Sequence, residues 1–460
     1  MVSTGRVVIA APASGTGKTL VATGLMAALR ARGHVVAPGK VGPDYIDPGY
    51  HTLAAGRQGR NLDPVLVGEH TVAPLFGHGA RGADLAVIEG VMGLYDGRLG
   101  AEGFGSTAHV AELLDAPVLL VVDARGQSRS LAALLHGFRT YSSGVRIAGV
   151  ILNNVGSPRH TEVLTEAANE VGLEVLGSLP RAAEVGVPSR HLGLLTAAEH
   201  GAEAEAAVRG MGELVAEHLD LDAVVRVARS APPLTGPDWA PGLEPEPGSP
   251  VVAVASGRAF TFGYAEHTEL LEAAGARVVT LDPLRDTALP PETAGLVLPG
   301  GFPELHAKDL AERAGLRAEI AGFARAGGPV HAECAGLLYL AQHLDGVPMC
   351  GVVPADARFT ERLALGYRDA VATSDSVLFR AGERVAGHEF HRTTIEPGHG
   401  ETAAWGLPGN RLEGFVTGQV HASYLHTHPV GSPEAITRFV AACARHMVDL
   451  PRSTQPRGRR

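Results

Sequence analysis

The segment from Arg6 to Thr19, RVVIAAPASGTGKT, constrains the fold of this chain more than any other feature. It begins with an apolar run that is typical of a buried parallel strand, and it continues through a turn of glycines and small residues. A helical stretch, TLVATGLMAALRARG, follows at once. Strand, glycine-rich turn and helix are the context in which a phosphate-binding loop is expected. The alternative is a turn of the same shape that binds nothing.

The loop chemistry depends on a few side chains and on its glycines. The glycines allow backbone N–H groups to turn toward an anion at the start of the helix. Lys18 is expected to neutralise the β- and γ-phosphates, and the Thr19 hydroxyl to hold Mg²⁺. Pro12 stands where the usual pattern G-x-x-x-x-G-K-[ST] has its first glycine. The residues expected to bind the nucleotide here are Gly15, Thr16, Gly17, Lys18 and Thr19.

The bulk composition fits a globular protein of several domains. The chain has 460 residues, of which 45% are hydrophobic and 19% are charged. Its net charge of -10 argues against nucleic-acid binding as the main activity. We find no apolar run of about 18 residues that would predict a membrane span, and the first strand starts too early to leave room for a signal peptide. Three cysteines without metal-ligand spacing fit the reducing cytoplasm.

The chain divides into two stretches of alternating strands and helices. Strand-like runs in the first stretch are RVVIAA, HVVAPGKV, ADLAVIEGV, APVLLVVDA, VRIAGVILNNV and LEVLGSLP. They predict a doubly wound, mostly parallel α/β sheet over residues 1–229. Residues 230–249 are rich in Pro, Gly and acidic residues and predict a linker. A second α/β pattern covers 250–450, and a basic tail covers 451–460.

Charged side chains follow the second and third of these runs. Lys40, Asp44 and Tyr45 come after HVVAPG, Glu89 ends DLAVIE, and Asp96 lies in the next loop. Ligands of such sheets bind at the carboxyl ends of strands. We therefore expect Lys40 to stabilise a transferring phosphoryl group, and Glu89 and Asp44 to hold Mg²⁺. Ordinary turn residues are the alternative, and an Asp-Gly turn explains Asp96 equally well.

Weaker candidates lie further along the first stretch. Asp123 and the pair Asn153-Asn154 also stand at strand ends, where an Asn amide is suited to reading an adenine base through a donor and an acceptor. The capping of a turn is the alternative for these asparagines. Arg190 and His191 are candidates for contact with an anionic substrate, with a solvated loop as an equal alternative.

In the second stretch, Cys334 lies where the strand-like run PVHAEC meets the helical run AGLLYL. This placement is similar to a nucleophile elbow, in which a sharp turn exposes the nucleophile and the helix N-terminus lowers the pKa of a thiol. The N–H groups of Gly301, in the upstream segment LPGG, and Ala335 are expected to form an oxyanion hole. The alternative for Cys334 is an inert buried cysteine.

A thiol nucleophile also needs a base, and the segment HASYLHTH offers His421, His426 and His428. Together with His388 and His391 these residues raise the alternative of a metal site. Their spacing fits no closed zinc pattern and there is no thiolate pair, so substrate contact or packing is favoured.

Several segments of both domains occur in the order found in one known family. They are APASGTGKT, KVGPDYIDPGYH, VIEGVMGLYDG, VPSRHLGL, LPGGFPELHA, AECAGLLYL, GHEFH and ASYLHTH. By these segments the chain resembles the amidotransferases of cobalamin biosynthesis that make the a,c-diamides of cobyrinic or hydrogenobyrinic acid. The resemblance implies a phosphate-loop domain similar to dethiobiotin synthetase, fused to a class I glutamine amidotransferase domain.

The resemblance also assigns roles to individual residues. It implies that Cys334 is the nucleophile that attacks glutamine and that His426 activates it. His428 stands where class I amidotransferases usually carry Glu, as expected within this branch, and what orients His426 is left open. Asp44, Tyr45 and Asp96 are the positions expected to orient the acceptor or the intermediate.

The implied activity joins the two domains. Ammonia released from glutamine would attack an acyl phosphate made with ATP and Mg²⁺, twice, at the c and a carboxylates of the corrinoid. A preference for Arg, Ala and Gly over Lys indicates G+C-rich coding and favours hydrogenobyrinate, by association with aerobic lineages. Cobyric acid synthase and nickel-sirohydrochlorin a,c-diamide synthase are enzyme alternatives. A nucleotide-switched protein similar to ParA/MinD, with an inert amidotransferase fold, is an alternative of another class; the question of a homodimer stays open.

Overall fold

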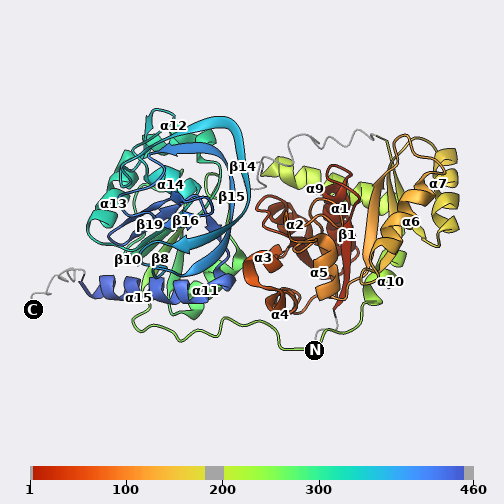
Figure 1. The fold of residues 1–460 in the computed structure, drawn as a ribbon, viewed down its shortest axis with the longest axis horizontal. Helices are drawn as coiled ribbons and strands as arrows, with labels where there is room; N and C mark the ends of the chain where they lie inside the picture. The colour runs from red at the N-terminus through yellow and green to blue at the C-terminus, as the bar shows by residue number, and fades with distance from the viewer. Residues whose placement is uncertain (1–3, 182–200, 450–460) are drawn as a thin grey trace, which may run out of the picture. The chain divides into compact units, whose positions relative to one another are not determined.

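The computed structural model describes residues 4–181 and 201–449, and the chain forms two compact units (Figure 1). Unit 1 ends at Ala240 and unit 2 begins at Pro241, so the division falls inside the segment 230–249 that separates the two hydrophobic patterns. Each unit has its own sheet and covering helices. The predicted α/β class is confirmed.

Unit 1 is built on a seven-stranded sheet with the order β3-β2-β4-β1-β5-β6-β7. All neighbouring strands are parallel, and β1 is buried along its whole length, as an apolar strand between two helical layers should be. The sequence missed only β3, which has three residues and lies at the edge. The strands are β1 Gly5–Ala10, β2 Val36–Val41, β3 Arg60–Leu62, β4 Leu85–Glu89, β5 Val118–Asp123, β6 Ile147–Val155 and β7 Val175–Pro180.

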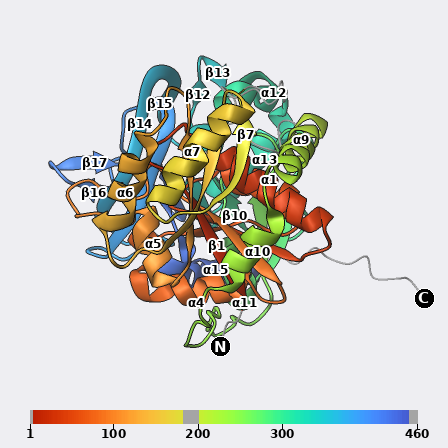
Figure 2. The same cartoon turned by 90° about the vertical axis from the view of Figure 1, so that its right-hand side faces the viewer.

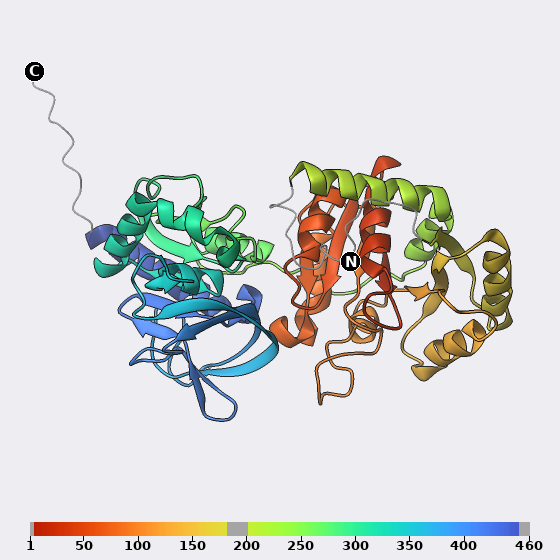
Figure 3. The ribbon, with the colours of Figure 1, turned by 90° about the horizontal axis from the view of Figure 1, so that it is seen from above.

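Helices cover both faces of this sheet. Helix α1 packs against α2 and α9, and Figures 2 and 3 show this layer on the opposite side of the sheet from α5 and α6. The helices are α1 Lys18–Ala31, α2 Asp47–Ala55, α3 Pro64–Val67, α4 Glu69–Gly79, α5 Thr107–Leu113, α6 Leu131–Tyr141, α7 Pro158–Glu170, α9 Ala202–His218 and α10 Leu221–Arg229. The loops after β1, β2 and β4 therefore open at one edge of the sheet, because these strands are parallel neighbours.

The central sheet of unit 2 has the order β18-β19-β11-β10-β8-β9. Its strands are parallel except for the edge pair β18 and β19, which is antiparallel. This parallel core places the ends of β10, β11 and β19 side by side. The strands are β8 Val251–Ala255, β9 Arg277–Leu281, β10 Thr293–Leu298, β11 Val330–Glu333, β18 Phe415–Thr417 and β19 Val420–Ser423.

A second sheet in unit 2 is dominated by the long antiparallel pair of β14 and β15, which curves over the outside of the unit in Figure 1. The polar residues of β15 break the apolar pattern, so the sequence did not predict this strand. This sheet contains β12 His343–Leu344, β13 Val347–Pro348, β14 Asp356–Ala372, β15 Arg384–Glu396, β16 Trp405–Leu407, β17 Arg411–Glu413 and β20 His426–Thr427.

The helices of unit 2 are α11 Ala265–Ala273, η1 Pro303–His306, α12 Ala307–Glu312, α13 Ala314–Arg325, α14 Ala335–Leu340, η2 Pro429–Gly431 and α15 Pro433–Asp449. The helical region after residue 302 is divided into three short segments, η1, α12 and α13. Across the described parts of the two units, no helix is both long enough and apolar enough to cross a membrane.

The short helix α14 approaches the end of β10 very closely. A Cβ on Gly336 would lie 2.1 Å from the backbone oxygen of Leu298, and the Gly336 N–H donates to the oxygen of Pro299. Backbone atoms cannot move aside as a flexible side chain can, so this contact requires glycine. The contact sets the position of the residues that come just before α14.

We expect Gly336→Ala to destabilise unit 2 by about 1–3 kcal/mol, because the added methyl group forces α14 away from β10. Urea unfolding followed by circular dichroism measures the change in midpoint. Gly322→Ala is the matched control: Gly322 lies in α13 with nothing within 4 Å of its Cβ position, and the exchange should stabilise by about 0.5–1 kcal/mol. Equal midpoints for the two variants would contradict the close approach.

Candidate active sites

The predicted phosphate loop joins β1 to α1, and its backbone has the conformation that its glycines allow. Gly15 and Gly17 have φ angles of 76° and 105°. A Cβ on Gly17 would lie 2.3 Å from Asn153 Nδ2, and that nitrogen donates to the backbone oxygen of Thr16 at 2.8 Å. Asn153, an adenine candidate from the sequence, therefore supports the loop in this structure.

Lys18 starts α1 and is buried against the backbone of two loops. Its Nζ donates to the oxygen of Met92 at 2.6 Å and to that of Ala13 at 3.2 Å. Burial, followed by repulsion from Lys40, lowers the pKa of Lys18 to about 8. Backbone oxygens of two glycine-rich loops hold this ammonium group. It can bind an anion that enters the phosphate loop.

Glu89 ends β4 and lies at the centre of a buried polar cluster. Pairing of β2 with β4 sets Lys40 beside Glu89, with Lys40 Nζ 3.0 Å from Oε1. Oε1 also accepts from Thr19 Oγ1 at 2.6 Å, and Oε2 lies 2.7 Å from His51 Nε2. Burial alone would raise the pKa of Glu89, but Lys40 and His51 hold it well below its usual value. The residue is an ionised carboxylate that contacts the loop threonine.

Two members of this cluster, Asp47 and His51, were not selected from the sequence. Both belong to α2, four residues apart, so they share one helix face. Asp47 Oδ2 accepts from Lys40 Nζ at 2.6 Å, and His51 is fully buried. The available signal was a second carboxylate in PDYIDP that is followed, at helical spacing, by a histidine.

Lys40 faces three carboxyl groups, those of Asp44, Asp47 and Glu89. Burial lowers the pKa of Lys40, but Asp47 and Glu89 raise it above its usual value. Burial, then Asp44 and Glu89, raise the pKa of Asp47 well above normal, which favours its neutral form. The oxygens of Thr19 and Glu89 are ligands that suit Mg²⁺.

The three predicted acceptor-orienting residues lie in the loops after β2 and β4. Asp44 Oδ1 accepts two backbone N–H groups at the start of α2, at 2.8 and 2.9 Å. Asp96 Oδ2 accepts the N–H of Gly93 at 3.0 Å, and Tyr45 is buried. The structure brings these residues to the same edge of the sheet as the loop, and their contact with a substrate stays a prediction.

In unit 2, Cys334 joins β11 to α14 in a strained conformation. Its φ of 46° and ψ of -98° lie where side chains other than glycine are uncommon. The Cys334 N–H donates to Ser423 at 2.7 Å, and the sulfur lies 3.9 Å from the oxygen of Phe390. A sharp, strained strand-to-helix turn is the geometry of a nucleophile elbow.

The thiol of Cys334 is kept protonated by its surroundings. Burial and then the Glu304 carboxylate raise its pKa far above the usual value, while the N–H groups of Ala335 and Gly301 lower it. The two groups predicted for the oxyanion hole are thus the backbone groups that favour negative charge on the sulfur. Because the resting thiol is neutral, attack on a substrate needs a base that takes the proton.

His426, the predicted base, begins β20 and is buried. Burial lowers its pKa to about 4, and the Glu333 carboxylate opposes that shift. The ring packs on Gly300, where a Cβ would lie 2.2 Å from Cε1. Because the backbone N–H of the neighbouring Gly301 lowers the pKa of Cys334, the LPGG turn acts on both predicted catalytic side chains.

The other histidines of unit 2 are packing partners of different elements. Burial lowers the pKa of His388 and of His421 to about 3, and His391 stacks on Tyr424 with ring centroids 3.8 Å apart. Within residues 4–181 and 201–449, no group of three or more His, Cys, Asp or Glu is arranged to hold a metal ion. The candidates Arg190 and His191 lie outside the described residues.

Two protein families match the chain, one in each unit. Residues 7–194 match the family described as the CobQ/CobB/MinD/ParA nucleotide binding domain. Residues 251–433 match the CobB/CobQ-like glutamine amidotransferase domain. The first match covers the phosphate loop with Glu89, and the second covers Cys334 and His426. The predicted pairing of a nucleotide-binding domain with an amidotransferase domain is confirmed.

Curated relatives match the chain across both units. Proteins of Mycobacterium bovis and Streptomyces coelicolor, both named hydrogenobyrinate a,c-diamide synthase, are 58% identical over 95% of this chain and cover 98% and 97% of their own lengths. A protein of Gloeobacter violaceus named cobyrinate a,c-diamide synthase is 42% identical over 95% of this chain and 96% of its own. The likeness thus extends over nearly the whole length of these relatives.

The lowered pKa of Lys18 predicts proton uptake when a nucleoside triphosphate binds. Near pH 8.5 much of the free chain has a neutral Lys18, and bound phosphates raise the pKa again because they favour the ammonium. Binding should therefore take up roughly half a proton or more at that pH, and affinity should fall as pH rises through about 8. Titration calorimetry of a non-hydrolysable ATP analogue, in two buffers of different ionisation enthalpy, measures the uptake.

Lys18→Arg is the matched control for this measurement, because a guanidinium stays charged over the whole range. It should bind without the buffer-dependent heat. If the parent gives the same heat in both buffers near pH 8.5, Lys18 is already fully protonated and the assigned environment is wrong.

Proposed function

We propose, on the premise that this chain belongs to the a,c-diamide synthase family of glutamine-dependent amidotransferases, that it amidates the a and c acetate side chains of hydrogenobyrinate. Glutamine is the nitrogen donor and ATP supplies the energy, in the biosynthesis of cobalamin. The observation that carries the proposal is the presence in one chain of two complete sites: a phosphate loop with its carboxylate cluster, and a strained cysteine elbow with a histidine beside the same turn.

In unit 2, Cys334 attacks the side-chain amide carbon of glutamine while His426 takes the thiol proton. The N–H groups of Gly301 and Ala335, which favour negative charge at Cys334, hold the oxyanion of the tetrahedral intermediate. His426 returns the proton to the leaving nitrogen, and ammonia departs. Water then hydrolyses the glutamyl thioester to glutamate and frees the thiol.

In unit 1, a carboxylate of the corrinoid attacks the γ-phosphorus of ATP and gives an acyl phosphate and ADP. This activation is needed because a carboxylate is a poor electrophile. Lys18 and Lys40 spread the charge of the transferring phosphoryl group. Asp44, Tyr45 and Asp96 orient the acceptor. Ammonia then attacks the acyl carbon, and phosphate leaves to give the amide.

The residues of unit 1 fit a bound Mg²⁺. The Thr19 hydroxyl and the Glu89 carboxylate lie 2.6 Å apart beside the loop, with Asp44 in the adjoining loop as a further carboxylate. When bound, the ion supplies charge neutralisation between the phosphates. His51 and Lys40 keep Glu89 ionised for that role.

Hydrogenobyrinate is the favoured substrate because the relatives named for it are more similar to this chain than those named for cobyrinate. Relatives that are 54–58% identical are named for hydrogenobyrinate, whereas those named for cobyrinate are 38–42% identical. We place the enzyme in the cytoplasm, since its three cysteines, Cys334, Cys350 and Cys443, are all free thiols.

The activities of the two sites can be measured separately by offering either glutamine or ammonium chloride as the nitrogen source. Cys334→Ala should lower glutamine-dependent amidation by about 10⁴-fold or more and keep amidation with ammonium chloride, because the acyl phosphate is made in unit 1. Lys18→Ala should lower product about 100-fold or more with either source. Chromatography of the corrinoid product measures both.

Two outcomes would contradict this separation. If Cys334→Ala loses both activities while its circular dichroism is unchanged, the thiol acts outside glutamine hydrolysis. If Lys18→Ala keeps amidation with ammonium chloride, the loop is not the ATP site.

The substrate assignment predicts two acid-to-amide replacements on hydrogenobyrinate. Mass spectrometry is applied after hydrogenobyrinate and cobyrinate are offered separately with Mg-ATP and glutamine. The metal-free substrate should give diamide at the higher kcat/KM. Diamide formed faster from cobyrinate would contradict the choice of ring, and four amides would indicate a cobyric acid synthase.

A further inference from the structure

The geometry around His426 suggests a group that orients it, and the group is not at the position where class I amidotransferases carry Glu. His428 occupies that position. Its Nδ1 accepts the N–H of Val430, its ring lies 4.1 Å from that of Tyr264, and its Nε2 is 3.9 Å from Glu266 Oε2. These contacts hold His428 against η2 and α11, so it is engaged elsewhere.

A carboxylate from another strand lies beside His426 instead. Glu333 is the last residue of β11, directly before Cys334, and its Oε2 is 3.8 Å from His426 Nδ1. Parallel pairing places Glu333 opposite Ser423 of β19, three residues before His426. Glu333 thus lies next to Cys334 in the chain and beside the His426 imidazole in space.

The Glu333 side chain is fixed by contacts to its other oxygen. Oε1 accepts the N–H of Thr427 at 3.1 Å and its hydroxyl at 2.9 Å, and His331 Nε2 lies 3.2 Å away. With Oε1 held from three directions, Oε2 is the oxygen left to face His426.

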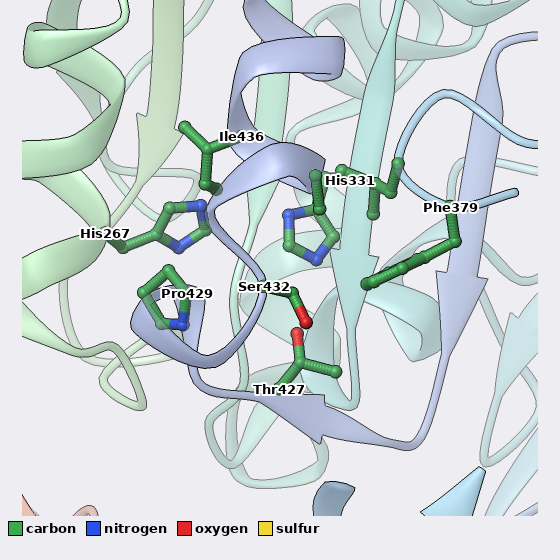
Figure 4. A pocket seen from close by; sticks show the side chains of 9 residues that line it. His267, His331, Phe379, Thr427, Pro429, Ser432 and Ile436 are labelled. Atoms are coloured by element: carbon green, nitrogen blue, oxygen red, sulfur yellow. The ribbon is translucent and has the colours of Figure 1, made fainter. Parts of the chain in front are cut away.

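His331 is itself held in place in a small cavity. Figure 4 shows the rings of His331 and His267 turned toward the same space, with Thr427 and Ser432 beside it. The cavity has a volume of about 10 Å³, which is near the room that one water molecule needs. Buried His331 Nδ1 has no hydrogen-bond partner among the described residues. An ionised carboxylate can only accept, so the hydrogen bond between His331 and Glu333 is donated by Nε2.

Glu333 is ionised in this setting. Burial raises its pKa, but His331 and then His426 and His267 lower it further, to about 2. On the other side, burial lowers the pKa of His426, while Glu333 and Glu389 raise it and His391 and His331 lower it. Glu333 is the largest of the influences that favour a charged His426.

We propose that Glu333 is the positioning residue that orients His426 and stabilises its imidazolium while Cys334 gives up its proton. This inference rests on the proposed glutaminase chemistry. The proton moves from the thiol to the imidazole Nε2, and Nδ1–H points to the Glu333 carboxylate, which stays ionised throughout. The third member of the catalytic group is thus supplied from the residue before the nucleophile.

Glu333→Gln tests the role, because it keeps the shape and removes the charge. The glutaminase kcat should fall by about 10–100-fold, with KM for glutamine within about threefold. Iodoacetamide labelling of Cys334, located by peptide mass spectrometry, should slow by a similar factor, because fewer thiols are ionised. Glu333→Asp keeps the charge and should recover part of both rates.

Controls separate this role from a merely structural one. Glu383, directly before β15, pairs with Arg438 at 2.5 Å, and Glu383→Gln should leave kcat and labelling unchanged. If Glu333→Gln does not fold, Thr427→Val, which removes only the hydroxyl bound to Oε1, should lower kcat about 3–10-fold.

The remaining outcomes distinguish a failure of the proposed function from a failure of the role of Glu333. A parent chain that releases no glutamate from glutamine overturns the proposed function. An active parent whose Glu333→Gln variant keeps kcat within about threefold overturns only the role of Glu333. A loss seen in KM alone, or a loss in kcat that Glu333→Asp does not recover, also overturns it.

Discussion

Parallel strands end at one edge of a sheet, and every candidate catalytic group of this chain depends on that constraint. In unit 1, the register of β2 and β4 sets Lys40 against Glu89 and places both next to the loop from β1. In unit 2, β10, β11 and β19 end together, so that the LPGG turn meets Cys334. Residues far apart in sequence become neighbours because the strands that carry them are hydrogen-bonded. The fold thus places these positions together, and the residue types at the strand ends determine the chemistry.

The two sites differ in the charge of their buried groups before the reaction. Unit 1 buries the Lys40 ammonium together with the ionised carboxylate of Glu89, and this suits a reaction that moves a highly charged phosphoryl group. Unit 2 keeps its thiol and imidazole neutral by burial. Charge is created there only when the proton moves, and the fixed carboxylate of Glu333 is placed where that charge appears. Each environment matches the charge that its own reaction develops.

Much of this could be predicted from the sequence, and the exceptions have physical causes. The apolar runs located the strands of unit 1, and the glycine pattern located the loop, because these features are local. The strand β15 was missed because its pairing with β14 compensates for a weak local pattern. Asp47 and His51 were missed because their importance comes from burial against Lys40 and Glu89. Glu333 escaped notice for a similar reason: only the pairing of β11 with β19 brings it to His426.

The central claim is that nitrogen liberated at Cys334 becomes the amide nitrogen of the corrinoid product made at the phosphate loop. Mass spectrometry of the product formed from glutamine labelled with ¹⁵N in its side-chain amide tests it most directly. The account predicts a diamide in which both new nitrogens are ¹⁵N, and no labelled diamide from a chain whose Cys334 has been alkylated. Unlabelled amides from the intact chain, or labelled amides from the alkylated one, would contradict it.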